Sequence, residues 1–309
     1  MFVVQRISQP RAQLEQLGSK EKFWFRVDDG KSLFKATQKH PDGSPTGEDW
    51  AEKIACELAS LLGIPHVHYD LAVWVNGADH RGSVCANFVP QNWFLVHGNE
   101  LLQQRDSHYP KAPAYKFKVV EHTIDAVFSI VTNMQPPPEP FCQGLPELVS
   151  DAPGVFAGYL LLDAWTANQD RHHENWGALR KNGTLCLAPT FDHGASLARN
   201  CTDQEREERM KTRDVRRTLD AFVSKAKSAF FKAGIPDKPL TPLAAWTEWS
   251  SRTPAAAAAW TARLESVDET QVLALLEQIP STHMTATERQ FTRKLLELNR
   301  RRILDGGAS

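Results

Sequence analysis

Residues 168–175, NQDRHHEN, place Asp170 and Asn175 in the spacing D-x-x-x-x-N, directly after an apolar run. Asp192 follows 17 residues after Asn175, within the sequence FDHG. Phosphoryl transfer requires an acid that orients or deprotonates the attacking hydroxyl, and oxygen ligands that hold Mg²⁺ against the nucleotide phosphates. Asp170 fits the first role, and Asn175 and Asp192 fit the second. Each motif alone is weak, but the two in this order predict a phosphoryl-transfer site.

A lysine and a helix upstream fit the same chemistry. Lys35 ends the strand-like run LFKA, 17 residues before Glu52 in the helical segment GEDWAEKIACELASLLGIP. In kinase-like sites a strand lysine paired with a helix glutamate holds the nucleotide phosphates. Glu52 points well away from the apolar stripe of the helix, whereas Glu48 and Glu57 lie on its flanks. Periodicity therefore leaves open which glutamate pairs with Lys35. The stripe consists of Ile54, Leu58, Leu61 and Leu62.

A loop that covers the phosphates is expected before the first strand, where the chain reads LGSKEK at residues 17–22. This segment has one glycine, Gly18, and contains neither G-x-G-x-x-G nor G-x-x-x-x-G-K-[ST]. Ser19, Lys20 and the nearby backbone N–H groups are suited to cradle a phosphate. The same residues also fit an ordinary polar turn.

The order of elements predicts an α+β fold with two lobes. Strand-like runs surround one helix in the first part of the chain, and helical patterns dominate beyond residue 120. We expect a small β-rich lobe over residues 1–92 and a larger, mostly helical lobe over residues 93–309. The expected strands are 23–27, 31–36, 70–75 and 83–89, and two further strand-like runs between 176 and 198 flank Asn182-Gly183. The main expected helices lie in 47–65, which Gly63 and Pro65 end, and at 121–134, 155–167 and 285–304.

Composition excludes several classes of protein. The 309 residues include 36 Lys+Arg and 37 Asp+Glu, giving a net charge of −1, so direct binding to nucleic acid is not expected. No apolar run approaches the ~20 residues of a membrane-spanning helix, and the first residues lack the apolar core of a signal peptide. A cytoplasmic protein is expected. The five cysteines contain no C-x-x-C pair and are interpreted as incidental thiols. No cysteine or acidic partner lies beside His66 and His68, which are expected to be strand residues rather than metal ligands.

Taken together, these segments resemble the HipA-like kinase family of bacteria, the toxin kinases of toxin–antitoxin modules. The resemblance rests on LGSKEKFWF, LFKA, GEDWAEKIACELASLLGIP, ANQDRHHENW and LAPTFDHGASL, and covers roughly residues 17–200. It implies a bilobal protein-kinase-like fold that uses ATP and Mg²⁺ to phosphorylate serine or threonine in a protein. Known targets in this family include aminoacyl-tRNA synthetases, and an antitoxin protein is an implied partner. Because the kinase-like part begins almost at once, the chain looks like the short, stand-alone branch.

The resemblance also implies a role for individual residues. It makes Asp170 the catalytic acid, Asn175 and Asp192 the metal ligands, and Lys35 the phosphate-holding lysine, with Glu52 as its partner. Ser19 matches a serine whose autophosphorylation ejects the phosphate loop and switches the enzyme off. The residues implied to bind ATP are Gly18, Ser19, Lys20, Lys35, Glu52 and the hinge Asn87, Phe88 and Val89.

Two other functions fit parts of the pattern. The string D-R-H-x-x-N at residues 170–175 also resembles phosphoinositide kinases, in which a histidine, here His172, can share the proton transfer. The loop after Asp192 carries one arginine before an acidic stretch, which offers little to an anionic membrane surface. A nucleotide-binding pseudokinase is the non-enzymatic alternative, motivated by the glycine-poor loop and by His193 in FDHG.

Overall fold

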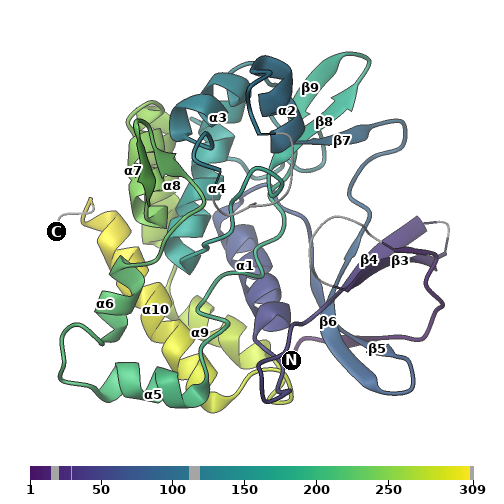
Figure 1. Cartoon of the computed structure of the whole chain (residues 1–309), viewed down its shortest axis with the longest axis vertical. Helices are drawn as coiled ribbons and strands as arrows, with labels where there is room; N and C mark the ends of the chain where they lie inside the picture. Colours follow the sequence, from purple (N-terminus) through teal and green to yellow (C-terminus); the bar gives the residue numbers. More distant parts are fainter. Residues whose placement is uncertain (15–20, 29, 111–118, 307–309) are drawn as a thin grey trace.

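The computed structural model describes residues 1–14, 21–28, 30–110 and 119–306. A strongly twisted sheet forms one side of the molecule, a group of helices forms the other, and helix α1 (Glu48–Leu62) lies between them (Figure 1). This mixed α+β arrangement, with a β-rich N-terminal region and a helical C-terminal part, confirms the predicted fold class. The expected boundary between residues 92 and 93 stays a prediction.

The N-terminal sheet is antiparallel except at one edge. Among the described residues, six strands form it in the order β1-β5-β6-β4-β3-β2. Strand β1 is parallel to β5, and the other neighbours are antiparallel. Aromatic side chains hold one face together, with the Phe23 ring centred 5.2 Å from Phe34 and 4.9 Å from Trp74. The strands are β1 (Val4–Ile7), β2 (Gln13–Leu14), β3 (Lys22–Val27), β4 (Gly30–Ala36), β5 (Asp70–Val75) and β6 (Asp79–Ala86).

Helix α1 is buried on nearly all sides rather than along one stripe. Its apolar residues belong to the main hydrophobic core, together with those of the C-terminal helices. Its first turn is also buried and carries Glu48 and Asp49. Asp49 accepts hydrogen bonds from Arg81 of β6 and from His283, which lies 2.7 Å away in the segment before the last helix. These contacts join the sheet, α1 and the C-terminal part.

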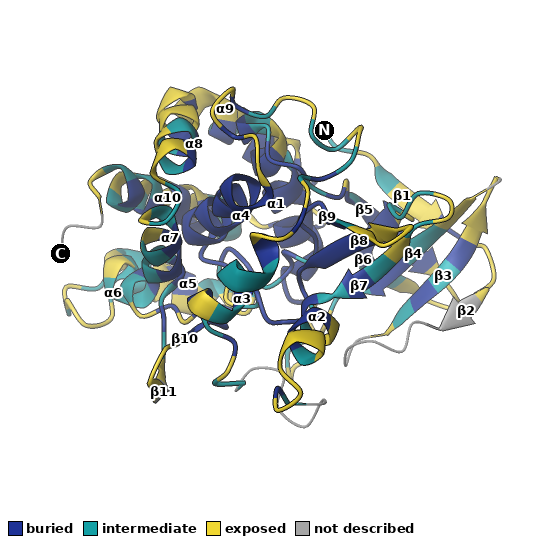
Figure 2. Cartoon of the chain, turned by 90° about the horizontal axis from the view of Figure 1, so that it is seen from above, coloured by how far each residue is buried: buried dark blue, intermediate teal, exposed yellow. Residues whose placement is uncertain are grey.

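The helical part is built around α4 (Ala152–Thr166), all of whose residues are buried. Figure 2 shows α4 and most of α1 as dark, buried elements at the centre of the molecule. The Asp151 side chain accepts from the backbone N–H of Gly154 at the start of α4. The surrounding helices are α2 (Gly98–Arg105), α3 (Ile124–Val131), α5 (Asp203–Lys211), α6 (Leu219–Ser224), α7 (Pro242–Ser250), α8 (Pro254–Ser266), α9 (Glu269–Gln278) and α10 (Ala286–Leu304).

A small sheet follows the segment that carries the D-x-x-x-x-N motif. Strands β7 (Phe94–His97), β8 (Gly177–Lys181) and β9 (Thr184–Leu187) pair in that order. Asn182 and Gly183 join β8 to β9 with φ of 50° and 83°, the conformation that the predicted Asn-Gly hairpin turn requires. The motif is therefore a loop fixed at both ends, between the buried helix α4 and this hairpin.

Sequence analysis missed some elements. It did not predict β1, or the pair β10 (Phe231–Lys232) and β11 (Ile235–Pro239), which lies in the mostly helical part of the chain. His68 lies in the connection between α1 and β5, so the expectation that it is a strand residue is wrong. Strand β1 pairs with a strand far away in the sequence, and β10 and β11 form only a two-stranded ribbon. All three strands are short, so the apolar patterning within them is weak.

Candidate active site

A buried ion pair fixes the loop that follows α4. Asp163, on the last turns of α4, accepts from Arg171 Nε and Nη2, both at 2.8 Å, and from Asn168 Nδ2 at 2.8 Å. Asp163 is 3% exposed and Arg171 is 1% exposed. A buried charge is stable only when it is paired and hydrogen-bonded. The loop conformation is therefore determined from inside the protein.

The same arginine connects this loop to the segment before Asp192. Arg171 Nη1 donates to the backbone carbonyl of Asn175 at 2.7 Å and to that of Phe191 at 3.3 Å. One guanidinium thus holds both halves of the predicted site in place. Sequence analysis missed Arg171 and Asp163. The available signal was the aspartate inside an otherwise apolar helix, since such a residue requires a cationic partner.

The backbone orients Asp170, His172 and Asn175 within the loop. The Asp170 carbonyl accepts from Asn175 Nδ2 at 2.8 Å, so the Asn175 Oδ1 is the atom that can coordinate a cation. The backbone N–H of Glu174 donates to His172 Nδ1 at 3.1 Å, so in the neutral ring the proton is on Nε2. That Nε2 lies 3.6 Å from Asp170 Oδ1. His172 therefore faces the predicted catalytic carboxylate with an N–H group.

Lys35 lies between two carboxylates. Its Nζ is 3.3 Å from Asp192 Oδ1, 3.9 Å from Glu52 Oε2 and 3.3 Å from the hydroxyl of Tyr69. Burial disfavours its charged form, but Asp192, Tyr69 and Glu52 together raise the pKa of Lys35 well above its usual value. Lys35 is therefore a fixed cation at the end of β4.

Asp192 has a left-handed backbone conformation, with φ of 60°. Residues other than glycine rarely adopt this region, and at functional sites such strain is held by the surrounding contacts. The neighbouring residues are anchored here, because Arg171 holds the Phe191 carbonyl and Glu52 holds the next two backbone N–H groups. The carboxylate of Asp192 is turned toward Lys35 as a result.

Glu52 is the glutamate that meets Lys35. It does lie on a different face of α1 from the apolar stripe, but that face is also buried, since Glu52 is 2% exposed. Its Oε1 accepts from the His193 backbone N–H at 2.6 Å, and its Oε2 accepts from Gly194 N at 3.1 Å. A Cβ at position 194 would lie only 3.1 Å from Oε2, so any larger residue there would have to displace the glutamate by a few tenths of an ångström.

The other two glutamates have different partners. Glu48 accepts from the Gln38 backbone N–H at 2.9 Å and forms an ion pair with Arg199. Glu57 pairs with Lys53 at 2.6 Å. The geometry thus distinguishes the three glutamates, which helical periodicity alone did not.

His193, in the sequence FDHG, is fully buried. Its Nε2 lies 2.9 Å from Thr190 Oγ1, and its Nδ1 lies 3.4 Å from Glu52 Oε1. Burial lowers the pKa of His193. The side chain is therefore held between Thr190 and Glu52.

The predicted hinge residues follow β6, at the connection to β7. The Asn87 backbone N–H donates to the Lys31 carbonyl at 2.9 Å, and its Oδ1 accepts from Val89 N at 3.3 Å. The Phe88 ring stacks on Phe191, with centroids 5.7 Å apart. Gly18, Ser19 and Lys20, which are predicted to cover the phosphates, lie outside the described residues.

The donor set suits a hard divalent cation. Asn175 offers a carboxamide oxygen, and Asp192 offers a carboxylate whose charge Lys35 balances. Mg²⁺ prefers such oxygen ligands and is commonly held by one or two carboxylates together with substrate phosphates. The residues present therefore fit a magnesium–nucleotide site.

Comparison with known proteins gives structural similarity alone. No protein-family model matches the sequence, and no curated protein matches it. The structure of the Helicobacter pylori proinflammatory kinase CtkA is similar, with a TM-score of 0.73 at 17% identity, over 98% of this chain and 96% of that one. HipA from Shewanella oneidensis, solved with HipB and operator DNA, gives a TM-score of 0.55 at 12% identity, over 96% of this chain and 65% of that one. The chain therefore has a kinase-like fold of the kind found in CtkA and HipA.

Proposed function

We propose that the chain is an ATP- and Mg²⁺-dependent serine/threonine protein kinase of the HipA-like type. The observation that carries this proposal is the position of Lys35, between Asp192 at 3.3 Å and Glu52 at 3.9 Å. The sequence analysis expected these groups, together with Asp170 and Asn175, from motifs far apart in the chain. A kinase-like fold agrees with the same assignment.

Each residue then has a defined task. Bound Mg-ATP would supply the phosphoryl group, and its Mg²⁺ would offset the negative charge of the phosphates. Lys35 would hold the α- and β-phosphates, while Asn175 and Asp192 would provide oxygen ligands for the metal. Asp170 orients the attacking hydroxyl and accepts its proton. His172 acts as a positioning residue, because its Nδ1 is engaged by the Glu174 N–H and its Nε2 faces Asp170.

The proposed substrate is a hydroxyl group of a protein. An aminoacyl-tRNA synthetase is one candidate, by resemblance to the HipA-like family, and an antitoxin protein is a proposed partner. HipA itself was solved in a complex of a toxin–antitoxin system with HipB. We further propose a cytoplasmic location and regulation by autophosphorylation at Ser19. No helix among the residues that the structure describes is long and apolar enough to cross a membrane.

The environment of Arg199 argues against the lipid-kinase alternative. Arg199 is the basic residue that follows Asp192 in the loop, and its side chain is only 11% exposed. It forms an ion pair with Glu48, and its carbonyl accepts from Gly47 N at 3.0 Å. An arginine used in this way is directed at α1 and not at an anionic headgroup.

The test is incubation with Mg-ATP followed by intact-mass measurement and peptide mapping. We expect phosphate on the wild-type protein or on an added protein substrate, and none with Asp170→Asn. Asp79→Asn, an exposed aspartate in the β5–β6 region, is the matched control and should behave as wild type. Transfer by Asp170→Asn at the wild-type rate would refute the assignment. ATP binding without any transfer, to itself or to candidate proteins, would favour the pseudokinase.

A further inference from the structure

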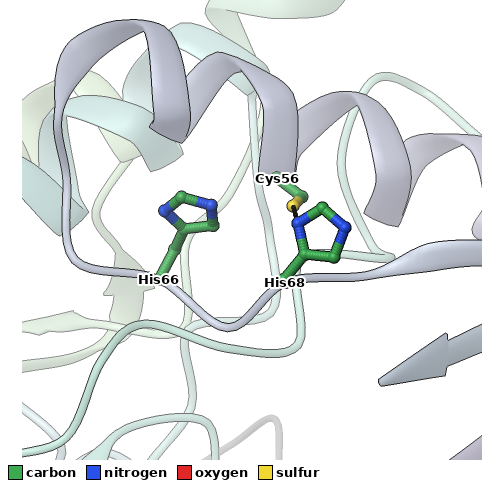
Figure 3. Close-up of side chains that lie close together, drawn as sticks. All are labelled: Cys56, His66 and His68. Carbon is green, nitrogen blue, oxygen red and sulfur yellow. Dashed lines mark hydrogen bonds between the residues drawn. The ribbon is translucent and has the colours of Figure 1, made fainter. Parts of the chain in front are cut away.

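Three side chains of the kinds that can bind a metal ion meet where α1 connects to β5. They are Cys56 of α1 and His66 and His68 of the connection, and one potential ligand atom of each lies within 4.8 Å of those of the other two (Figure 3). The expectation that the two histidines have no cysteine partner is wrong. Cys56 precedes the two histidines in the sequence, on α1. The turn at the end of α1 brings the histidines back alongside it.

The spacing is close to that of a tetrahedral site. With Zn–S of about 2.3 Å and Zn–N of about 2.0–2.1 Å, tetrahedral angles place sulfur and nitrogen ligands about 3.6 Å apart. The observed separation of Cys56 Sγ and His68 Nδ1 is 3.7 Å. This pair already has the separation of two tetrahedral ligands, and the His66 ligand atom lies within 4.8 Å of both.

The hydrogen bonds of both rings fix which nitrogen carries the lone pair. His66 Nδ1 lies 2.7 Å from the Ile64 carbonyl, which can only accept, so Nδ1 carries the proton and Nε2 has the lone pair. Ser60 Oγ lies 3.1 Å from that Nε2, so a metal ion would replace the hydroxyl there. His68 Nε2 lies 3.3 Å from the Asp70 carboxylate and donates to it, which directs Nδ1 toward Cys56. Metal-bound histidines typically donate their second N–H to a carbonyl or carboxylate in this manner.

Asp70 is itself held in place. Lys53 Nζ lies 3.0 Å from Asp70 Oδ1 and also pairs with Glu57. The cluster thus has ligands and also groups that orient them. Its one exposed member is His68, whose side chain is 65% exposed, so an ion can enter from solvent on that side.

We propose that Cys56, His66 and His68 bind a transition-metal ion of the Zn²⁺ class, with a fourth coordination position left for water or another ligand. Thiolate and imidazole ligands select Zn²⁺ and similar ions over Mg²⁺. On binding, Cys56 loses its thiol proton to solvent, and an S–metal bond and two N–metal bonds form without any change of oxidation state.

Such an ion would connect three parts of the protein. Cys56 lies one turn beyond Glu52 on α1. The connection that carries His66 is hydrogen-bonded to the segment before Asp192, since Val67 N donates to the Thr190 carbonyl and Thr190 N donates to the Pro65 carbonyl, both at 2.9 Å. The metal would therefore tie α1 to the connection after it, and the hydrogen bonds of Thr190 join that connection to the segment before Asp192. Metal binding by these three residues does not depend on the proposed kinase activity.

The experiment is a titration of the full-length, metal-free protein with Co²⁺, followed by calorimetric titration with Zn²⁺. We expect one equivalent of Co²⁺ to produce a thiolate-to-metal charge-transfer band and the visible absorption of tetrahedral cobalt, both bleached by Zn²⁺ and unaffected by excess Mg²⁺. Zn²⁺ should also raise the melting temperature, because it binds the folded state.

Variants identify the ligands. His68→Ala changes an exposed side chain and should fold, yet abolish the cobalt spectrum, whereas Asp70→Asn should weaken Zn²⁺ binding by about 10–100-fold. Cys56→Ser should remove the charge-transfer band. His108→Ala, in an exposed His–Asp pair that has the same 3.3 Å separation, and Cys142→Ser are the matched controls and should bind normally. Absence of the charge-transfer band in the wild type, or its persistence in folded His68→Ala, would overturn the proposal.

Discussion

Lys35 lies closer to Asp192 than to Glu52, at 3.3 Å compared with 3.9 Å. This lysine thus neutralises the carboxylate that we assign to the metal. Entry of Mg²⁺ would transfer that role from the lysine to the ion and release the ammonium group for the phosphates. The position of Lys35 is therefore suited to replacement of its ammonium group by Mg²⁺ beside Asp192.

Removing the Lys35 charge should weaken nucleotide binding. Charge-assisted hydrogen bonds contribute about 1.5–3 kcal/mol, so Lys35→Met should reduce ATP affinity by roughly 10–100-fold, measured by calorimetry in Mg²⁺. Lys31→Met is the matched control, since Lys31 is exposed on the same strand, with its Nζ 4.7 Å from the centre of the Trp24 ring. Equal ATP affinity for Lys35→Met and wild type would contradict the assignment.

The carboxylate of Asp170 should matter for transfer rather than for binding. Asp170→Asn should lower the single-turnover rate of phosphate transfer by at least ~100-fold, because the amide cannot accept the hydroxyl proton. ATP affinity should remain unchanged. His172→Gln should lower the rate by a smaller factor without moving its pH profile, as expected for a positioning residue. A larger loss for His172→Gln than for Asp170→Asn would reverse the two roles.

Breaking the buried Asp163–Arg171 pair should destabilise the whole fold. Either Asp163→Leu or Arg171→Met alone should cost about 3–5 kcal/mol in urea unfolding, since each leaves an uncompensated buried charge. The double variant should cost less than the sum of the two. Arg293→Met provides the comparison, because Arg293 forms an exposed pair with Glu269 and should cost less than about 1 kcal/mol. Additive losses at Asp163 and Arg171 would show that the pair is not coupled.

His122 should make stability depend on pH. Its Nδ1 donates to the Ala229 carbonyl and its Nε2 accepts from Trp176 Nε1, so the buried ring is held neutral. Burial lowers the pKa of His122 to about 3, from an ordinary value of 6.5. Between these values the unfolded chain binds a proton that the folded protein does not. This difference removes about 1.4 kcal/mol of stability for each unit that the pH falls.

The corresponding measurement is the free energy of unfolding from neutral to acidic pH. His122→Gln should flatten the dependence by the equivalent of one proton below pH 6.5, whereas His108→Gln, at an exposed position, should leave it unchanged. An identical pH dependence for His122→Gln and wild type would show that this histidine titrates normally in the folded state.

Local patterns predicted the elements that carry their own signals. Apolar spacing predicted α1 and α4, and Asn182-Gly183 predicted the β8–β9 hairpin, because periodicity and turn chemistry are properties of neighbouring residues. The motifs around Asp170 and Asp192 likewise predicted which residues form the candidate site, although their catalytic roles stay predictions.

What the sequence did not predict depends on contacts between distant residues. The helical wheel of α1 could not select Glu52, because it assumes a solvent face, and this helix has the sheet on one side and helices on the other. The Asp163–Arg171 pair and the meeting of Cys56 with His66 and His68 depend on how the chain turns after a helix. Side-chain patterns do not encode those turns.

The burial of α1 has a consequence for how the proposed kinase activity would be regulated. In protein kinases the position of the corresponding helix controls whether its glutamate reaches the lysine. Here α1 shares the main core with the C-terminal helices, and Asp49 binds both Arg81 and His283. Its backbone amides should therefore exchange with deuterium only through global unfolding, at the slowest rates in the chain. We therefore expect any regulation to act through substrates and loops, and not through movement of α1.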